Sequence, residues 1–303
     1  MSDTPAGPRP FVDRPMPDRS EGSAVAAAWA DTWSLPAPSL LRHGMNSLYL
    51  CGDVVLRVGA ATAPAVLSHR LVSWLLSCGV PTLHPIEGLA ADVDGLAVTG
   101  WEYVRATRQA VDWEAIGAAV RLVHSLPVDD VPAGYPVPSP AGFPWWDFGS
   151  MLEDVSGDLD SVAFEGLAAA VERHRYWVDG IGEAPVLCHG DVHPGNVLMS
   201  GRGALLVDWD LLCYANRAWD HAMLTTYAQR WGGTADVYRR FAAGYGESLA
   251  GDGLTSSLAE LRNVAATLMR VRAGRTDEAA GVEAERRLRY WRGEPDAPVW
   301  RAQ

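Results

Sequence analysis

Residues 188–210 read CHGDVHPGNVLMSGRGALLVDWD, a polar segment that alternates with short apolar runs. Within it, Asp191 is followed five residues later by Asn196, and Asp208 comes twelve residues after that. The question is which chemistry needs two carboxylates and one amide at this spacing. Two simple interpretations, a metal site and a polar loop without chemistry, have to be compared with a third, phosphoryl transfer.

A metal-hydrolase site is suggested by His189, Asp191 and His193, which are all residue types that bind metals. Zinc sites that use two histidines four residues apart need both of them on one face of a continuous helix. Gly190 and Pro194 prevent such a helix. We therefore favour neither this metal site nor a loop without chemistry.

Phosphoryl transfer explains the spacing better, because the protein must then position a hydroxyl, bind Mg²⁺ on nucleotide phosphates and offset charge. The kinase catalytic loop is H-R-D-x-x-x-x-N, in which the Asp receives the hydroxyl proton and the Asn binds a metal. The segment HGDVHPGN has His189, Asp191 and Asn196 at the same offsets. Asp208 ends an apolar strand, where a second, metal-binding carboxylate is expected.

With HGDVHPGN followed by LLVDWD, the sequence resembles the Brenner-type motif of the aminoglycoside phosphotransferase and choline kinase superfamily. These small-molecule kinases share the protein-kinase-like fold. The resemblance runs from about Leu40 to the helices after Asp220 and is most specific over 188–220. It implies a bilobal α+β fold, with a small antiparallel-sheet N-lobe that carries one helix and a larger, mainly helical C-lobe.

The resemblance assigns roles to the acidic and amide residues of the motif. Asp191 is the expected catalytic base, which orients the acceptor hydroxyl. Asn196 and Asp208 are the expected Mg²⁺ ligands, since amide and carboxylate oxygens suit this ion. Asp210 serves either a second metal or only the fold. Asp220, in the segment NRAWDHA, is expected to brace the catalytic loop from the core.

The segment HGMNSLYLCGDVVLRVG, residues 43–59, resembles the family's phosphate-covering hairpin and the strand that follows it. Asn46 and Ser47 would place backbone N–H groups or a hydroxyl near phosphate. The position of the usual lysine is Arg57, and the chain contains no lysine at all. Arginine keeps the charge and can bind two phosphate oxygens, but it is longer and planar. The alternative is that Arg57 is an ordinary surface arginine. The glutamate that usually pairs with the family's lysine is also missing, since residues 58–86 contain no acidic residue.

The segment VTGWEYVRA, residues 98–106, resembles the hinge that pairs with the adenine edge. If Trp101 guards the rear of the pocket, the carbonyl of Glu102 and the amide of Val104 meet the base. Trp101 is equally compatible with an ordinary core position, which would shift this register by one residue. ATP is the expected co-substrate, with GTP as the alternative.

Hydrophobic periodicity and turn residues divide the chain into a strand-rich first part and a helical second part. We expect these elements: a helix over 23–35, two or three strands over 39–59, a helix over 64–79, a hairpin over 82–104 that turns at Asp94-Gly95, a helix from Asp112, helices near 146–155 and 160–179, strands in PVLCHG and ALLVDWD, and helices from Trp219 to Trp291. The corresponding domains are a flexible tail (1–23), a nucleotide-binding N-lobe (24–104) and a catalytic, substrate-binding C-lobe (105–303).

The composition excludes several classes of partner. The formal net charge is −12 and no run of basic residues occurs, so neither nucleic acid nor an anionic membrane is an expected partner. The longest mostly apolar run, 71–80, is about half of the roughly 20 residues that a membrane-spanning helix needs. The four cysteines form no C-x-x-C pair, so a cytoplasmic location fits best. We expect a monomer or a homodimer.

The acceptor is indicated by residues 122–172, which contain nine acidic residues and no lysine or arginine. An acidic wall would attract a cationic alcohol such as an aminoglycoside or a similar antibiotic. A solvated acidic face is the alternative.

Three functions stay open: a kinase of cationic antibiotics, a metabolic kinase of a sugar, choline or amino alcohol, and a nucleotide-binding pseudokinase. The joint presence of Asp191, Asn196 and Asp208 argues against the pseudokinase.

Overall fold

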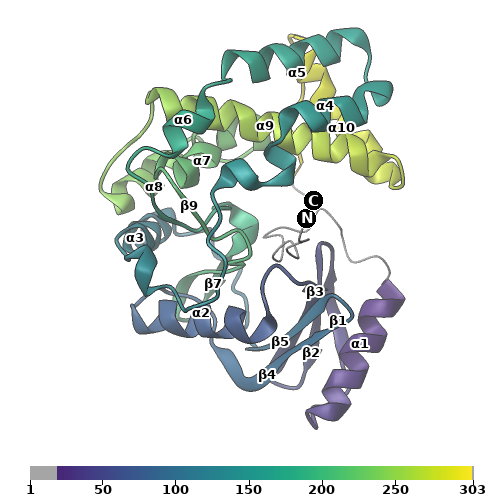
Figure 1. The fold of residues 1–303 in the computed structure, drawn as a ribbon, viewed down its shortest axis with the longest axis vertical. Helices are drawn as coiled ribbons and strands as arrows, with labels where there is room; N and C mark the ends of the chain where they lie inside the picture. The colour runs from purple at the N-terminus through teal and green to yellow at the C-terminus, as the bar shows by residue number, and fades with distance from the viewer. Residues whose placement is uncertain (1–18, 302–303) are drawn as a thin grey trace, which may run out of the picture. The chain divides into compact units, whose positions relative to one another are not determined.

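The computed structural model describes residues 19–301, which divide into two compact units (Figure 1). Most of the predicted tail, 1–18, lies outside the described residues, whereas 19–23 belong to the first helix. We call the two parts unit 1 and unit 2. Unit 1 contains the described residues up to Asp112, Leu126–Pro138 and Pro194–Leu212, and unit 2 contains Trp113–Ser125, Ser139–His193 and the chain from Cys213 onward.

Unit 1 is built on a five-stranded antiparallel sheet of order β1-β2-β3-β5-β4. The strands are β1 Ser39–His43, β2 Asn46–Cys51, β3 Val54–Ala60, β4 Pro85–Val93 and β5 Leu96–Glu102. The predicted turn at Asp94-Gly95 is confirmed, and both residues have positive φ angles (48° and 82°). The third strand that the sequence left open is present as β1.

Two helices, α1 Arg19–Thr32 and α2 Ala65–Ser77, accompany this sheet. Successive side chains of a strand point to opposite faces of the sheet, so alternate residues of β2 and β3 lie on the face toward α1 and on the opposite face. Tyr49, Leu56 and Val58 are buried in a core with Ala26 and Ala30 of α1. The other face of the sheet is therefore left for the remaining side chains of these strands.

A second hairpin belongs to unit 1 although it comes from the middle of the chain. It consists of β7 Val197–Ser200 and β8 Gly203–Leu206. The N–H of Leu206 donates to the carbonyl of Pro81 (2.9 Å). This bond fixes the end of β8, and with it the start of the segment 207–210.

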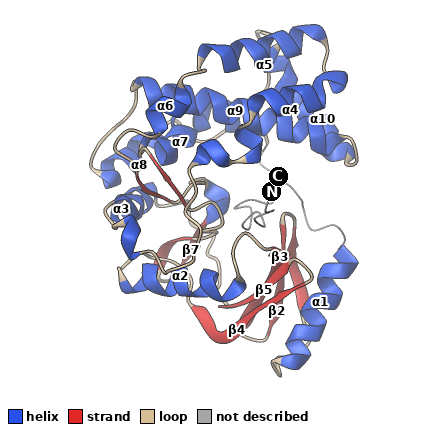
Figure 2. Cartoon of the chain, viewed as in Figure 1, coloured by secondary structure: helices blue, strands red, loops and turns tan. Residues whose placement is uncertain are grey.

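Unit 2 is almost entirely helical, as the colours of Figure 2 show. Its helices are α3 Trp113–His124, α4 Phe148–Val155, α5 Ser161–Arg173, α6 Trp177–Ile181, α7 Ala218–Trp231, α8 Val237–Tyr245, α9 Gly253–Gly274 and α10 Glu278–Trp291. Its only strands within the described residues are β6 Val186–Cys188 and β9 Cys213–Ala215, which pair with each other. No helix within 19–301 is long and apolar enough to cross a membrane.

Close packing of α3 on α8 depends on two glycines. A Cβ on Gly117 would lie 2.0 Å from the carbonyl oxygen of Phe241, and one on Gly244 would lie 1.8 Å from that of Glu114. Real side chains do not tolerate such distances. Any larger residue at either position would force the two helices apart.

The predicted helix over 160–179 is wrong in one respect, because it is interrupted between α5 and α6. The helical hydrogen bonds end at His174, whose imidazole contacts the carboxylate of Glu260 in α9 (2.5 Å). This contact comes from a distant part of the chain. Periodicity within the segment itself therefore cannot reveal it.

Candidate active site

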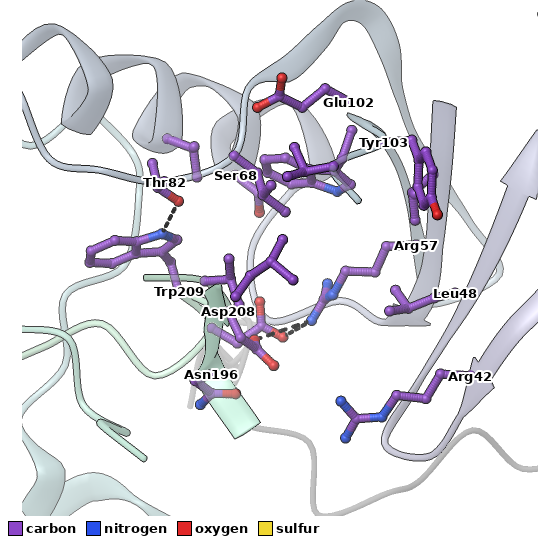
Figure 3. Close-up of a pocket in the computed structure, with 18 of the residues that line it drawn as sticks. Arg42, Leu48, Arg57, Ser68, Thr82, Glu102, Tyr103, Asn196, Asp208 and Trp209 are labelled. Atoms are coloured by element: carbon purple, nitrogen blue, oxygen red, sulfur yellow. Dashed lines mark hydrogen bonds and ion pairs between the residues drawn. The ribbon is translucent and has the colours of Figure 1, made fainter. Parts of the chain in front are cut away.

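Unit 1 contains a cavity of about 300 Å³ on the sheet face that α1 does not cover (Figure 3). Its walls come from β1 to β3, α2, the end of β5 and residues 195–210. This volume is at the lower end of the range for small-molecule sites. The predicted site residues that line it are Arg57, Glu102, Val104, Asn196 and Asp208. Residues assigned from four separate segments of sequence thus meet at one place.

Arg57 extends from β3 into this cavity and pairs with two carboxylates. It donates a hydrogen bond to Asp210, and its guanidinium lies 3.7 Å from the carboxylate of Asp208. Burial by itself would lower the pKa of Arg57, but these two carboxylates raise it above its ordinary value. Burial also raises the pKa of Asp210, with Arg57 opposing this effect. Arg57 is therefore a charged group of the cavity and not an ordinary surface arginine.

Asp208 has a left-handed backbone, with φ of 67°. This conformation is uncommon for residues other than glycine, although aspartate tolerates it better than most, and it is often found at functional sites. The N–H of the preceding Val207 donates to the carbonyl of Asn196 (2.9 Å), which ties the two expected metal ligands together. Asn196 is buried, whereas the Asp208 carboxylate is 40% exposed.

Two aromatic residues of the cavity were not predicted as site residues. Tyr135 donates to the carbonyl of Trp209 (3.3 Å), and the indole of Trp209 donates to Thr82 (3.0 Å). Together they fix the backbone between Asp208 and Asp210. Tyr135 lies within a proline-rich connection, residues 127–144, to which the sequence assigned no function, while Trp209 lay within the recognised motif and was given no role.

The segment after β5 offers main-chain groups to the cavity. Tyr103 donates its N–H to Asp53 (2.9 Å), but the N–H of Val104 takes part in no hydrogen bond with any residue of 19–301. The side chain of Glu102 binds the N–H of His84 (2.8 Å) and the guanidinium of Arg202 (2.6 Å). Val104 is therefore available as a donor, as the hinge interpretation requires.

Asn46 and Ser47 do not line the cavity. The Ser47 hydroxyl is buried and lies 2.8 Å from Nδ1 of His43. The Asn46 side chain covers Gly59, where a Cβ would lie 1.8 Å from its oxygen. Both side chains thus hold the β1–β2 hairpin, and a contact of their backbone with phosphate stays a prediction.

Asp191 belongs to unit 2, in a loop that is held from the core by α7. Asp220, which is 1% exposed, accepts hydrogen bonds from the N–H groups of His189 and Gly190 (both 2.8 Å). Gly190 has a φ of 94°, so a glycine suits this turn. The bracing role that the resemblance implied for Asp220 is confirmed. His124 of α3 contacts the same carboxylate (3.1 Å).

The carboxylate of Asp191 is surrounded by positive or protonatable groups. His193 lies 3.2 Å from it, and Arg262 of α9 lies 3.7 Å from it. Burial would raise the pKa of Asp191, but these neighbours hold it well below its usual range. Arg262 also donates to the carbonyl of Gly190 (2.8 Å) and stacks on Trp219 (4.5 Å). No sequence pattern singled out Arg262, because it is one of three arginines of α9.

Comparison with known protein families gives one match over residues 52–261, to the model described as the phosphotransferase enzyme family. This match spans more than half of the chain. The chain belongs to the phosphotransferase enzyme family. The family predicted from the HGDVHPGN motif is thereby confirmed. A sequence comparison with curated proteins found no match.

Solved structures similar to this chain include two other phosphotransferases. One is a spectinomycin phosphotransferase in complex with ADP and spectinomycin (TM-score 0.62, 16% identity, 84% of this chain and 89% of that chain). Another is an aminoglycoside phosphotransferase in complex with GDP and kanamycin (TM-score 0.66, 17% identity, 91% and 100%). A choline/ethanolamine kinase family protein from Mesorhizobium loti is also similar (TM-score 0.61, 18% identity, 91% and 95%). The predicted protein-kinase-like α+β fold is confirmed.

The metal-hydrolase alternative finds no support in this phosphotransferase. Among residues 19–301, the one group of three potential ligands with all ligand atoms within 4.8 Å is His124, Cys188 and Asp220. It includes neither His193 nor Asp191. In the loop itself, Nδ1 of His189 accepts a hydrogen bond from the N–H of Asp191 (3.2 Å) and is therefore not free to bind a metal.

Part of the negative charge of the acidic segment 122–172 is balanced by other residues of the chain. Five of its nine acidic residues form ion pairs with arginines or accept a hydrogen bond at the start of a helix. These are Asp154 and Asp158 with Arg275 (3.0 and 2.8 Å), Asp160 with Arg292 (2.7 Å), Glu172 with Arg175 (2.5 Å), and Asp147, which accepts from Ser150 at the start of α4. The partners lie mostly outside the segment, so its own composition could not reveal them.

The pair of His124 and Asp220 predicts a pH dependence of stability. Burial would lower the pKa of His124, but Cys188 and Asp220 raise it to about 9, above its ordinary value of about 6.5. The resulting stabilisation is complete below pH 6.5 and is lost as the pH rises through 9. We expect the free energy of unfolding, measured with denaturant, to fall by on the order of 3 kcal/mol over this range.

A His124→Gln variant is the control for this effect, because glutamine does not titrate. It should be less stable than the wild type at pH 6 and should lack most of the decline between pH 6.5 and 9. An unchanged decline in the variant would assign the pH dependence to other groups.

Proposed function

We propose that this protein transfers the γ-phosphoryl group of ATP to a hydroxyl group of a small molecule, with GTP as the alternative donor. The observation that carries the proposal is the cavity of unit 1, which gathers Arg57, Val104, Asn196 and Asp208. These residues supply a cation for phosphate, a free main-chain donor for the base, and oxygen ligands for a metal. The family membership and the nucleotide complexes of similar structures support it.

The cavity fits the magnesium ion that such a reaction uses. Its donor set is the amide oxygen of Asn196 and the carboxylates of Asp208 and Asp210, which are hard oxygen ligands. When bound, Mg²⁺ would offset the charge of the nucleotide phosphates. Asn196 and Asp208 would hold it, and Arg57 would exchange one carboxylate for phosphate oxygens.

Asp191 is proposed as the base that orients the acceptor hydroxyl. Its lowered pKa keeps the carboxylate ionised at neutral pH, so it can accept a hydrogen bond from the hydroxyl throughout the reaction. Its assignment to the same reaction as Asn196 rests on the HGDVHPGN spacing and the family motif. Positioning and electrostatic stabilisation then provide most of the acceleration.

An aminoglycoside or a similar cationic antibiotic is the proposed acceptor, supported by the two antibiotic phosphotransferases of similar structure. The ion pairs of the acidic segment favour a second candidate, a metabolic kinase of a sugar, choline or amino alcohol, because they leave less negative charge for a cation. A monomeric or homodimeric state, a cytoplasmic location and the two-lobe division at residues 104–105 are parts of the same proposal.

A nucleotide screen followed by an acceptor screen tests the proposed function. Thermal shift should show stabilisation by Mg²⁺ with ATP or GTP. ADP or GDP release should then be measured over aminoglycosides, sugars, choline and amino alcohols. Release with a polyamine antibiotic supports the first acceptor class, and release only with sugars, choline or amino alcohols supports the second. Nucleotide binding without turnover on any acceptor would instead indicate a pseudokinase.

Replacing Arg57 with alanine tests its role as the substitute for the usual lysine. We expect ATP affinity to fall by at least about tenfold, since a charge-assisted hydrogen bond to phosphate contributes roughly 1.5–3 kcal/mol. Calorimetry with Mg²⁺ and ATP measures the change. Arg57→Lys should restore part of the affinity. Unchanged affinity and turnover in Arg57→Ala would refute the role.

A further inference from the structure

Arg42 of β1 lies on the same row of the sheet as Arg57. In the observed register Arg42 is opposite Leu48 of β2, and Leu48 is opposite Arg57 of β3. Residues directly opposite in antiparallel strands present their side chains on the same face. All three line the cavity, and Figure 3 shows both guanidinium groups extending from the sheet toward the side of Asn196 and Asp208.

A β-bulge is the reason that Arg42 faces the cavity. The pairing of β1 with β2 shifts by one residue between Leu40, which is opposite Tyr49, and Arg42. Without this shift, Arg42 would be opposite Ser47, and Leu41 alone would be opposite Leu48. A bulge redirects the side chains that follow it. Both Leu41 and Arg42 therefore line the cavity.

The charges of the cavity leave Arg42 available to a ligand. Arg57 is shared between Asp208 and Asp210, and Glu102 is paired with Arg202. The guanidinium of Arg42 forms no hydrogen bond or ion pair with another residue of the described chain, 19–301, and the residue is exposed. An exposed guanidinium in a cavity whose carboxylates already have partners can bind an anionic ligand with little loss of existing contacts.

We propose that Arg42 binds the phosphate chain of the nucleotide and acts with Arg57 from the same face of the sheet. This inference rests on the proposed function. A nucleoside triphosphate carries more negative charge than one arginine offsets, and Arg57 must also balance Asp208 and Asp210. The bulged strand thus supplies a second cation in a lobe whose chain contains no lysine.

The test compares Arg42→Gln with the wild type by calorimetry with ATP, ADP and adenosine, in the presence of Mg²⁺. If Arg42 binds phosphate, affinity for ATP and ADP should fall by about tenfold, while affinity for adenosine changes less than about twofold. Arg42→Lys should recover part of the loss. The matched control is Arg70→Gln, which removes the same charge from an exposed position of α2 outside the cavity and should leave all three affinities unchanged.

Two results would overturn the inference while leaving the proposed function intact. One is unchanged ATP affinity in Arg42→Gln, and the other is an equal loss for ATP and adenosine, which would indicate a packing role. An equal effect of Arg70→Gln would also overturn it, since a diffuse charge effect would then suffice. If the wild type binds no nucleotide, the proposed function itself fails, and the inference fails with it.

Discussion

The Asp191→Asn variant should lose about a thousandfold in kcat while it retains the nucleotide affinity of the wild type, because a positioned base contributes typically 10²–10⁴-fold. Asparagine keeps the size of the side chain but can neither accept the hydroxyl proton nor carry the charge. The carboxylate that is removed contacts His193 and Arg262 (3.2 and 3.7 Å) and does not line the cavity of unit 1. Binding and turnover should therefore separate. Steady-state ADP release with the identified acceptor, and calorimetry with ATP, measure the two effects.

The matched control for this variant is Asp179→Asn, since Asp179 is an exposed aspartate of α6 in the same unit. It should have wild-type turnover and affinity. Retention of turnover in Asp191→Asn would reject Asp191 as the base. A parallel loss of nucleotide affinity and turnover would indicate instead that Asp191 supports binding or folding.

The Asp208→Asn variant should lose about a hundredfold of the Mg²⁺-dependent part of its ATP affinity, which corresponds to roughly 3 kcal/mol. Asparagine is the informative replacement because it tolerates the left-handed backbone (φ 67°) that Asp208 adopts, whereas alanine would add strain. The substitution removes the charged metal ligand and leaves Arg57 paired with Asp210. Calorimetry with ATP, with Mg²⁺ and with EDTA, measures the difference.

Comparison with Asp210→Asn separates the two roles that the sequence left open for that residue. If Asp210 only fixes Arg57, its variant should keep the Mg²⁺ dependence of nucleotide affinity. If it serves a second metal, the dependence should weaken as in Asp208→Asn. Unchanged Mg²⁺ dependence in Asp208→Asn would contradict the metal role of Asp208.

Elements defined by local patterns could be predicted from the sequence. Helix α2 follows from apolar residues three to four positions apart that end at Gly79, and the β4–β5 turn follows from Asp94-Gly95. The glycine breaks also separated α7, α8, α9 and α10 correctly. The motif spacing also predicted that Asn196 and Asp208 lie together, and both line one cavity with Arg57.

Features that depend on distant partners could not be predicted. Strands β6 and β8 were predicted, whereas their pairing strands β9 and β7, which are equally short, were not. Tyr135 and Arg262 acquire their roles only through contacts with residues more than 70 positions away. The ion pairs of the acidic segment could not be predicted for the same reason, because Arg275 and Arg292 lie far along the chain from Asp154 and Asp160.

The most direct test is a crystal structure of the protein with Mg²⁺ and a non-hydrolysable ATP analogue. We expect the adenine base to accept a hydrogen bond from the N–H of Val104 and the phosphates to contact Arg57. The metal should be bound by Asn196 and Asp208, and Arg57 should no longer pair with both Asp208 and Asp210. A nucleotide bound outside this cavity, or a metal that contacts neither Asn196 nor Asp208, would contradict the account.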